Sequence, residues 1–203
     1  MEKKILIFDL DGVLINSKNN MLSAWRYTNK INNLNIPFSS YFKNIGTPFK
    51  NILKKLKVRK YHNKIEQCFR EESIKKINKI KLYPDVKKTL LHVKSKNYKI
   101  GILTSKDKKR TKKILKKFKI NYLFDFIECP EVGCRGKPYP DQILKIMKIY
   151  SANPKLVTYI GDMKSDLITA KRAKINFVYA KYGYGKISKT NSIKRFSDIT
   201  KLV

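Results

Sequence analysis

The sequence predicts an α/β fold, a doubly wound parallel sheet with an inserted helical subdomain. Three observations support this prediction. Short apolar runs of strand length recur along the chain, stretches with helical spacing lie between most of them, and one long stretch contains helical patterns alone. Alternation of strands and helices favours crossover connections and therefore parallel strand pairing.

Five segments have the length and composition of buried strands. Their apolar residues are continuous rather than alternating, which is typical of strands covered on both faces of a parallel sheet. The segments are 3–9, 99–104, 123–129, 156–162 and 175–180. They predict the central sheet, and the tail from residue 186 is expected to close the core with a short helix and a strand.

Four segments between these strands have apolar residues at helical spacing. They are 84–97, 106–118, 141–150 and 165–173. In the second of them, Thr111, Ile114, Leu115 and Phe118 recur three or four positions apart and so share one face of a helix. We expect these helices to cover the faces of the sheet.

The stretch from 17 to 80 interrupts the alternation. It contains helical patterns at 19–31, 49–56 and 61–77 but no convincing strand. A stretch of about sixty residues is too long for a simple crossover between strands. The sequence therefore predicts an α/β core formed by 1–16 and 81–203, with a helical subdomain at 17–80.

The formal net charge of +32 raises the question of a nucleic-acid partner. Forty of the 47 basic residues are lysine and seven are arginine, whereas bidentate contacts to phosphates and bases usually need arginine. Lysine, isoleucine and asparagine all have A/T-rich codons, so a mutational bias would give this composition without selection for a partner. We expect lysine-rich solvated faces and no specific nucleic-acid partner.

No apolar run approaches the ~20 residues needed to cross a bilayer. The opening MEKKILIFDLDG begins like a secretion signal, but Asp9 and Asp11 end its apolar stretch early. Three cysteines, at 68, 129 and 134, match no common zinc-binding spacing. These features predict a soluble cytoplasmic protein without a membrane partner.

Acidic residues follow two of the predicted strands. Asp9 ends the first strand and Asp11 lies two residues further on, while Asp162 ends the strand 156–162 and Asp166 follows one helical turn later. In an open α/β sheet, ligands bind at the carboxyl ends of the strands. If the two strands are neighbours, these carboxylates converge and need a cation, for which Mg²⁺ is the expected choice. For Asp162 or Asp166 alone, a helix cap is the alternative.

Hydroxyl and ammonium groups are expected at the same edge of the sheet. Thr104 and Ser105 follow the strand GILT, and Lys137 lies in the Pro-rich segment GKPYPD before a predicted helix. A metal ion, hydroxyl groups, an ammonium group and helix N-termini together suit a phosphoryl group.

Four short segments occur in an order that is typical of one enzyme superfamily. They are DLDGV at 9–13, ILTS at 102–105, KPYPD at 137–141, and GD at 161–162 followed by Asp166. In these motifs the chain resembles the haloacid dehalogenase (HAD) superfamily, and within it phosphatases with a small helical cap, such as phosphoglycolate phosphatase and β-phosphoglucomutase. The resemblance covers nearly the whole chain, including the helical insert, which corresponds to the cap.

The resemblance implies a role for each motif residue. Asp9 is expected to attack phosphorus and form an aspartyl-phosphate, and Asp11 to protonate the leaving oxygen and then activate water. Thr104 and Lys137 would hold the phosphoryl oxygens. The expected Mg²⁺-binding residues are Asp9, Asp11 through its backbone carbonyl, Asp162 and Asp166.

The cap is expected to select the substrate. Its segment 46–50 corresponds to the loop that relatives insert into the active site, so Thr47 and Lys50 are candidates for contacting the distal part of the substrate. A plain helix start with a solvated lysine is the alternative. Ser105, which stands where many relatives have Asn, is a further substrate-binding candidate.

Three functions are consistent with these features. The first is a Mg²⁺-dependent phosphatase for a small phosphorylated metabolite, acting as a monomer or homodimer. The second is a phosphosugar mutase of the β-phosphoglucomutase type, which would use the same Asp9 and Asp11. The third, suggested by the charge, is a nucleic-acid-binding protein or polynucleotide phosphatase, although no nucleic-acid-binding motif supports it.

Overall fold

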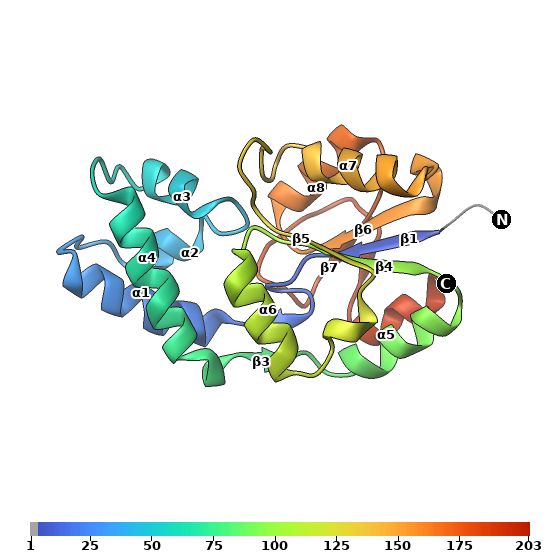
Figure 1. Ribbon diagram of the computed structural model, residues 1–203, viewed down its shortest axis with the longest axis horizontal. Helices are drawn as coiled ribbons and strands as arrows, with labels where there is room; N and C mark the ends of the chain where they lie inside the picture. Colours follow the sequence, from blue (N-terminus) through green and yellow to red (C-terminus); the bar gives the residue numbers. More distant parts are fainter. Residues whose placement is uncertain (1–3) are drawn as a thin grey trace.

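The computed structural model describes residues 4–203. A helical unit lies at one end of the molecule and a sheet flanked by helices at the other (Figure 1). Residues 1–3, part of the predicted core and its first strand, lie outside the described residues. Residues 4–203 contain no helix that is both long and apolar enough to cross a membrane.

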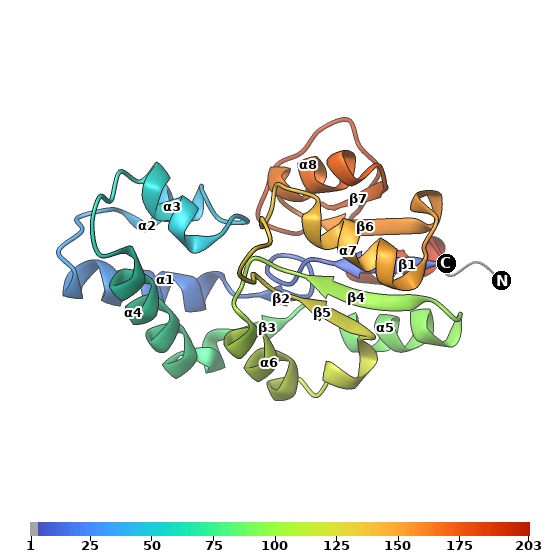
Figure 2. The same cartoon turned by 45° about the horizontal axis from the view of Figure 1, so that its top comes forward.

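The core contains one six-stranded sheet in the order β5-β4-β1-β6-β7-β8, and every neighbouring pair is parallel. Figure 2 shows β1 between β4 and β6. The strands are β1 Ile5–Phe8, β4 Lys99–Leu103, β5 Phe126–Glu128, β6 Val157–Gly161, β7 Asn176–Ala180 and β8 Ser192–Ile193. All four residues of β1 are buried, because helices cover both faces of the sheet.

Side chains of β1 alternate between two hydrophobic clusters. Leu6 and Phe8 pack on the face that is covered by α5, α6 and the C-terminal 3-10 helix η4, while Ile5 and Ile7 pack on the face that is covered by α7 and α8. The helices are α5 Val86–Ser95, α6 Lys108–Lys117, α7 Asp141–Tyr150, α8 Lys164–Ala173 and η4 Phe196–Lys201. Figure 1 shows the two helical layers on opposite sides of the sheet.

The inserted unit contains four helices around its own apolar cluster. They are α1 Lys18–Ile31, α2 Phe38–Phe42, α3 Phe49–Lys55 and α4 His62–Lys75. Trp25, Tyr41, Phe49 and Phe69 are buried in this cluster. The short helix α2 was not predicted, because five residues after Pro37 are too few for a helical periodicity to be recognised. A doubly wound parallel sheet with an inserted helical subdomain is thus confirmed.

Two short strands join the helical unit to the core. β2 Ile15–Asn16 pairs antiparallel with β3 Lys81–Leu82, at the positions where the sequence predicts the boundaries of the insert. Neither strand was predicted, since two residues carry no alternation pattern. In the tail, β8 precedes the 3-10 helix η4, and both complete the core beside β7 and α5.

Candidate active site

The carboxyl ends of β1 and β6 coincide, because the two strands pair in register from Ile5 and Val157 to Phe8 and Ile160. The backbone N–H of Asp9 donates to the carbonyl of Ile160 at 2.9 Å. The acidic residues that follow the two strands are thereby brought to one point at the edge of the sheet. This is the convergence that the sequence predicts for neighbouring strands.

Three carboxylates form a buried cluster at this point. Asp9, Asp162 and Asp166 each offer an oxygen atom, and these three atoms lie within 4.8 Å of one another. Asp166 also accepts a hydrogen bond from the backbone N–H of Met163 at 2.9 Å, at the start of α8. Asp166 therefore combines the two roles that the sequence left as alternatives, a helix cap and a member of the acidic cluster.

The charge of the cluster is not balanced by the protein alone. Burial raises the pKa of Asp9 to about 7, and the Asp166 carboxylate adds to this shift although Lys137 opposes it. Burial and the neighbouring Asp9 and Asp166 carboxylates raise the pKa of Asp162 well above its ordinary range. A bound cation would reverse both effects, since it favours the ionised form.

One buried oxygen of the cluster has no hydrogen-bond partner among residues 4–203. Oδ2 of Asp162 accepts from the backbone N–H of Tyr184 at 2.6 Å, but its Oδ1 is buried and unpaired among residues 4–203. A buried carboxylate oxygen is expensive to leave unpaired. Three carboxylates with a buried, unpaired oxygen among them fit a hard divalent cation such as Mg²⁺, which prefers oxygen ligands.

The Lys137 ammonium group contacts two carboxylates of the cluster. Its Nζ donates to Asp9 Oδ1 at 2.8 Å, to Asp166 Oδ1 at 2.7 Å and to the Tyr159 hydroxyl at 3.0 Å. Burial lowers the pKa of this lysine, but the two carboxylates outweigh burial and raise the pKa above its ordinary value. Lys137 is therefore a protonated cation that touches the predicted nucleophile directly.

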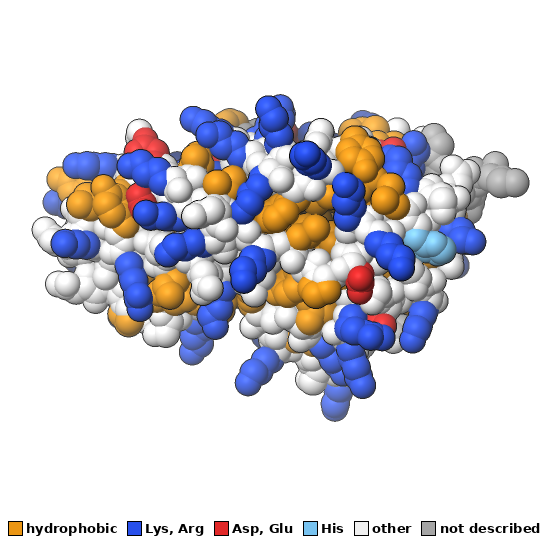
Figure 3. Space-filling view, turned by 90° about the horizontal axis from the view of Figure 1, so that it is seen from below, with side chains coloured by type: hydrophobic (Ala, Val, Ile, Leu, Met, Phe, Trp, Pro, Cys, Tyr) orange, Lys and Arg blue, Asp and Glu red, His pale blue; other side chains and the backbone are white. Residues whose placement is uncertain are grey.

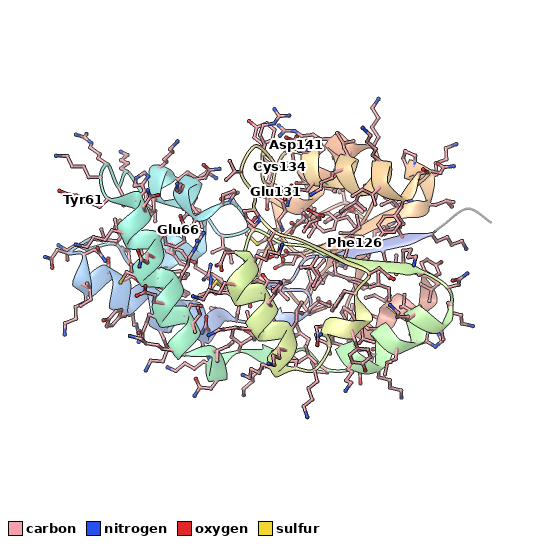
Figure 4. The ribbon with its side chains drawn as sticks, viewed as in Figure 1. Tyr61, Glu66, Phe126, Glu131, Cys134 and Asp141 are labelled. Atoms are coloured by element: carbon pink, nitrogen blue, oxygen red, sulfur yellow. The ribbon has the colours of Figure 1, made fainter. Side chains whose placement is uncertain are left out.

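The loop that carries Lys137 is fastened next to α7. Asp141 accepts from the Arg135 backbone N–H at 3.2 Å and from two nitrogens of the Arg135 guanidinium at 3.0 and 2.9 Å. Figure 4 shows Glu131 and Cys134 on this loop, near Asp141 at the start of α7. This bidentate pair ties the loop that carries Lys137 to the first residue of α7.

The Asp11 carboxylate lies outside the three-carboxylate cluster. It forms an ion pair with Lys106, with 3.1 Å between Nζ and Oδ2, and its Oδ1 accepts from the Ser17 hydroxyl. The next residue, Gly12, has a φ of +92°. A Cβ at this glycine would lie 2.2 Å from Asp162 Oδ2. The turn after β1 thus directs Asp9 and Asp11 to different partners.

The hydroxyl groups after β4 reach the same site. Thr104 is buried and its Oγ1 accepts from the backbone N–H of Lys106 at 3.2 Å. The Ser105 hydroxyl donates to the carbonyl of Gly46 at 3.2 Å. Because Gly46 belongs to the helical unit, Ser105 links that unit to the edge of the sheet.

A cavity lies between the helical unit and this edge of the sheet. From the core it is lined by Asp9, Asp11, Thr104, Ser105, Lys106, Arg110, Lys137 and Met163, and from the helical unit by Met21, Tyr41, Ile45, Gly46, Thr47, Phe49, Ile52 and Phe69. Thr47 is therefore at the cavity, as expected. Lys50 is exposed and does not line it, so the structure does not bring this residue to the others. Its neighbour Phe49 points inward instead.

Several residues at the site were not identified from the sequence. Tyr159 is fully buried in β6, and its hydroxyl lies 2.9 Å from Asp166 Oδ1. A tyrosine in the middle of a buried strand was the available signal, because its hydroxyl needs a partner there. Tyr184, in the segment KYGYGK, binds Asp162 through its backbone, and Gly183 and Gly185 allow this close approach. Lys106 and Arg110 could not be singled out among so many basic residues.

Comparisons with known proteins identify relatives that match this chain over most of its length. Haloacid dehalogenase-like hydrolase is the family that matches, over residues 6–180. A phosphoglycolate phosphatase of Aquifex aeolicus is 29% identical over 98% of this chain and 96% of its own length. A pyrophosphatase PpaX of Oceanobacillus iheyensis is 26% identical over 97% and 90% of the two chains.

A solved structure with the same architecture comes from Haemophilus somnus and is described as a predicted phosphoglycolate phosphatase. It is 25% identical, with a TM-score of 0.84, and the match covers 100% of this chain and 98% of that one. Together with the family match over most of the sequence, this likeness confirms the resemblance seen in the motifs. The chain belongs to the haloacid dehalogenase-like hydrolase family and is an enzyme of the hydrolase class.

Proposed function

We propose that the protein is a Mg²⁺-dependent phosphatase that hydrolyses a small phosphorylated metabolite through an aspartyl-phosphate on Asp9. The observation that carries this proposal is the buried Asp9 carboxylate at the end of β1, with the Lys137 ammonium 2.8 Å away. Asp11 and Thr104 line the same cavity. The names of the two curated relatives, a phosphoglycolate phosphatase and a pyrophosphatase, are consistent with phosphoryl transfer.

Each residue has a separate task in this proposal. A carboxylate oxygen of Asp9 attacks phosphorus, and the bond to the leaving oxygen breaks. Asp11 donates a proton to that oxygen and later takes one from the water that hydrolyses the aspartyl-phosphate. Thr104 and Lys137 hold the phosphoryl oxygens and offset their charge.

Asp9, Asp162 and Asp166, with the backbone carbonyl of Asp11, would hold the metal ion. When bound, Mg²⁺ would neutralise the carboxylates and supply positive charge to the phosphoryl group. The unpaired Oδ1 of Asp162 supports this assignment. Lys137 already contacts Asp9 and Asp166, so this ammonium can keep Asp9 oriented toward the cavity.

We propose that the helical unit, residues 17–80, acts as a cap that closes the cavity. Apolar side chains from this unit line the cavity opposite the acids. An apolar cover excludes water that would compete for the phosphoryl group and strengthens the charge interactions beneath it. Contact between Ser105 and Gly46 holds the cap against the core.

The proposal is tested by measuring phosphate release in the presence of Mg²⁺ from four substrates: 2-phosphoglycolate, inorganic pyrophosphate, a hexose phosphate and a 5′-phosphorylated oligonucleotide. We expect release from at least one of the small substrates and little from the oligonucleotide, because the cavity lies beneath the cap. Conversion of a hexose phosphate to its isomer without phosphate release would instead identify a mutase. No turnover of any small phosphate would contradict the proposal.

A further inference from the structure

Several polar groups that line the cavity have no task in the proposed mechanism, and two of them keep donor atoms that are unpaired among residues 4–203. These two are the hydroxyl of Tyr41, from the cap, and the guanidinium of Arg110, from α6. Both residues are more than nine-tenths buried, with exposed fractions of 3% and 7%. Buried polar groups almost always have partners, so the partners of these two groups need to be accounted for.

The ring of Tyr41 is held firmly. It stacks on Trp25 with ring centroids 4.5 Å apart and packs against Phe69 at 5.4 Å. Its hydroxyl makes no hydrogen bond to any of the described residues, 4–203. This aromatic packing fixes the Tyr41 hydroxyl in the lining of the cavity, where it is free to bind a ligand.

Arg110 is held from one side only. Its Nε pairs with the Asp107 carboxylate, which also accepts from the Arg110 backbone N–H at 3.0 Å. The guanidinium lies over the ring of Phe69, 5.4 Å from its centroid. Within residues 4–203 the two terminal amino groups have no hydrogen-bond acceptor, so they are available to a ligand in the cavity.

The Asp107 carboxylate is shared between two arginines, so it neutralises the Arg110 charge only in part. Arg70 of the cap approaches the same carboxylate, with 3.6 Å between Nε and Oδ2. Both groups pack against the same ring, since the Tyr41 ring centroid lies 5.4 Å from the Phe69 centroid and the Arg110 guanidinium carbon also lies 5.4 Å from it. A hydroxyl donor and a partly compensated guanidinium that line one cavity form a site that suits an oxyanion.

We propose that Tyr41 and Arg110 form a second anion-binding subsite, which binds an acidic group on the leaving part of the substrate. This inference rests on the proposed phosphatase function. It assigns the substrate to the phosphorylated compounds that carry a further carboxylate or phosphoryl group. An uncharged leaving group would cover the Arg110 amino groups and the Tyr41 hydroxyl without offering them an acceptor.

The test compares three substrates that differ at the leaving group. 2-Phosphoglycolate carries a carboxylate, inorganic pyrophosphate a second phosphoryl group, and phenyl phosphate no further charge. For wild type we expect kcat/KM to be highest for one of the two acidic substrates, and this ranking distinguishes a carboxylate from a phosphoryl group. Equal or higher kcat/KM for phenyl phosphate would overturn the proposal.

Tyr41→Phe removes only the hydroxyl from this subsite. We expect the preference for the acidic substrate over phenyl phosphate, as a ratio of kcat/KM values, to fall by roughly tenfold, mainly through KM. Tyr27→Phe, on an exposed tyrosine of the same cap, is the matched control and should keep the wild-type ratio. An unchanged ratio in Tyr41→Phe would contradict the subsite.

Arg110→Gln should reduce the same ratio by roughly 10- to 100-fold, because it removes a charged donor. Since Arg110 also holds the start of α6, Arg110→Lys is measured beside it, together with thermal unfolding of both variants. Arg110→Lys keeps the charge and should retain part of the preference. Equal losses on acidic and neutral substrates would show that Arg110 has only a structural role. If wild type released phosphate from none of the three substrates, the proposed function would fail together with this inference.

Discussion

Single residues at the active site differ in what they contact, and this difference separates their roles. Both oxygens of Asp166 have protein partners, since Lys137 and Tyr159 contact Oδ1 and the Met163 N–H contacts Oδ2. Asp162 has one unpaired oxygen. Asp162 is therefore the better candidate for a direct ligand, while Asp166 also orients Lys137.

A Mg²⁺ titration of phosphate release distinguishes these roles. For Asp166→Ala we expect the Mg²⁺ concentration for half-maximal activity to rise by ~10–100-fold. For Asp162→Ala this concentration should rise further. The activity of wild type should disappear with a chelator. An Asp162→Ala variant with the wild-type Mg²⁺ requirement would show that the cluster is not the metal site.

The raised pKa of Asp9 predicts how pH affects stability. Its ordinary pKa is 3.8 and its pKa in the folded protein is about 7, so the folded state binds the proton more tightly than the unfolded state does. Without metal, the stability from this group is complete below pH 3.8 and is lost as pH rises through about 7. Mg²⁺ displaces that proton, so it should stabilise more at pH 8 than at pH 5.

Thermal unfolding in chelator and in Mg²⁺, at both pH values, measures this effect. Asp9→Asn, which cannot ionise at this position, should show a smaller difference between the two pH values. A larger Mg²⁺ effect at pH 5 would have the wrong sign and would contradict the assignment of the metal to this cluster.

At the level of structural elements, the turn after β1 controls the site. Gly12 has a φ of +92°, and any Cβ there would collide with the Asp162 carboxylate. Gly133, in the loop before Lys137, has a similar φ of +80° with no atom within 4 Å of its would-be Cβ. A side chain at Gly133 would meet backbone strain alone, whereas a side chain at Gly12 would meet the same strain and a clash with Asp162. Comparing the two positions therefore isolates the effect of the clash.

Replacing each glycine with alanine tests this distinction. Gly133→Ala should cost about 1 kcal/mol of stability and retain activity, because only the backbone is strained. Gly12→Ala should cost more, roughly 1–3 kcal/mol for the strain plus the clash, and should abolish most phosphate release. Stability is measured by urea unfolding. Full activity of Gly12→Ala would show that the Asp162 position is not critical.

The sequence predicted those elements whose pattern is long enough to read. Strands β1, β4, β5, β6 and β7 lie within the predicted segments, because continuous apolar runs indicate strands buried on both faces. The two-residue strands β2 and β3 and the short helix α2 have no such pattern. Motif spacing indicated Asp9 and Asp162, but no motif or periodicity in the sequence singled out Tyr41. Its hydroxyl acquires a role only through the packing of the cap against the core.

The whole molecule carries a net charge of +32, and its distribution bears on possible partners. Figure 3 shows lysine and arginine side chains spread over an entire face, with apolar side chains between them, rather than gathered over one element. A nucleic-acid surface is usually a concentrated basic stripe or patch. The positive field would still attract small anionic substrates.

Nucleic-acid binding should therefore be weak and independent of sequence. In fluorescence anisotropy with labelled DNA and RNA, we expect binding at low salt to disappear near physiological ionic strength, as counterion release requires. Submicromolar affinity for a defined sequence at that salt concentration would favour a nucleic-acid function over the small-molecule phosphatase.

The central claim, that Asp9 carries the phosphoryl group, is tested most directly by trapping the intermediate. The enzyme is mixed with its best substrate and Mg²⁺, quenched in acid and digested, and the phosphorylated peptide is located by mass spectrometry. We predict a phosphoryl group on Asp9 in wild type, none in Asp9→Asn, and phosphate release from that variant reduced by roughly 10³-fold or more. A phosphoryl group on another residue, or near-normal turnover by Asp9→Asn, would contradict the account.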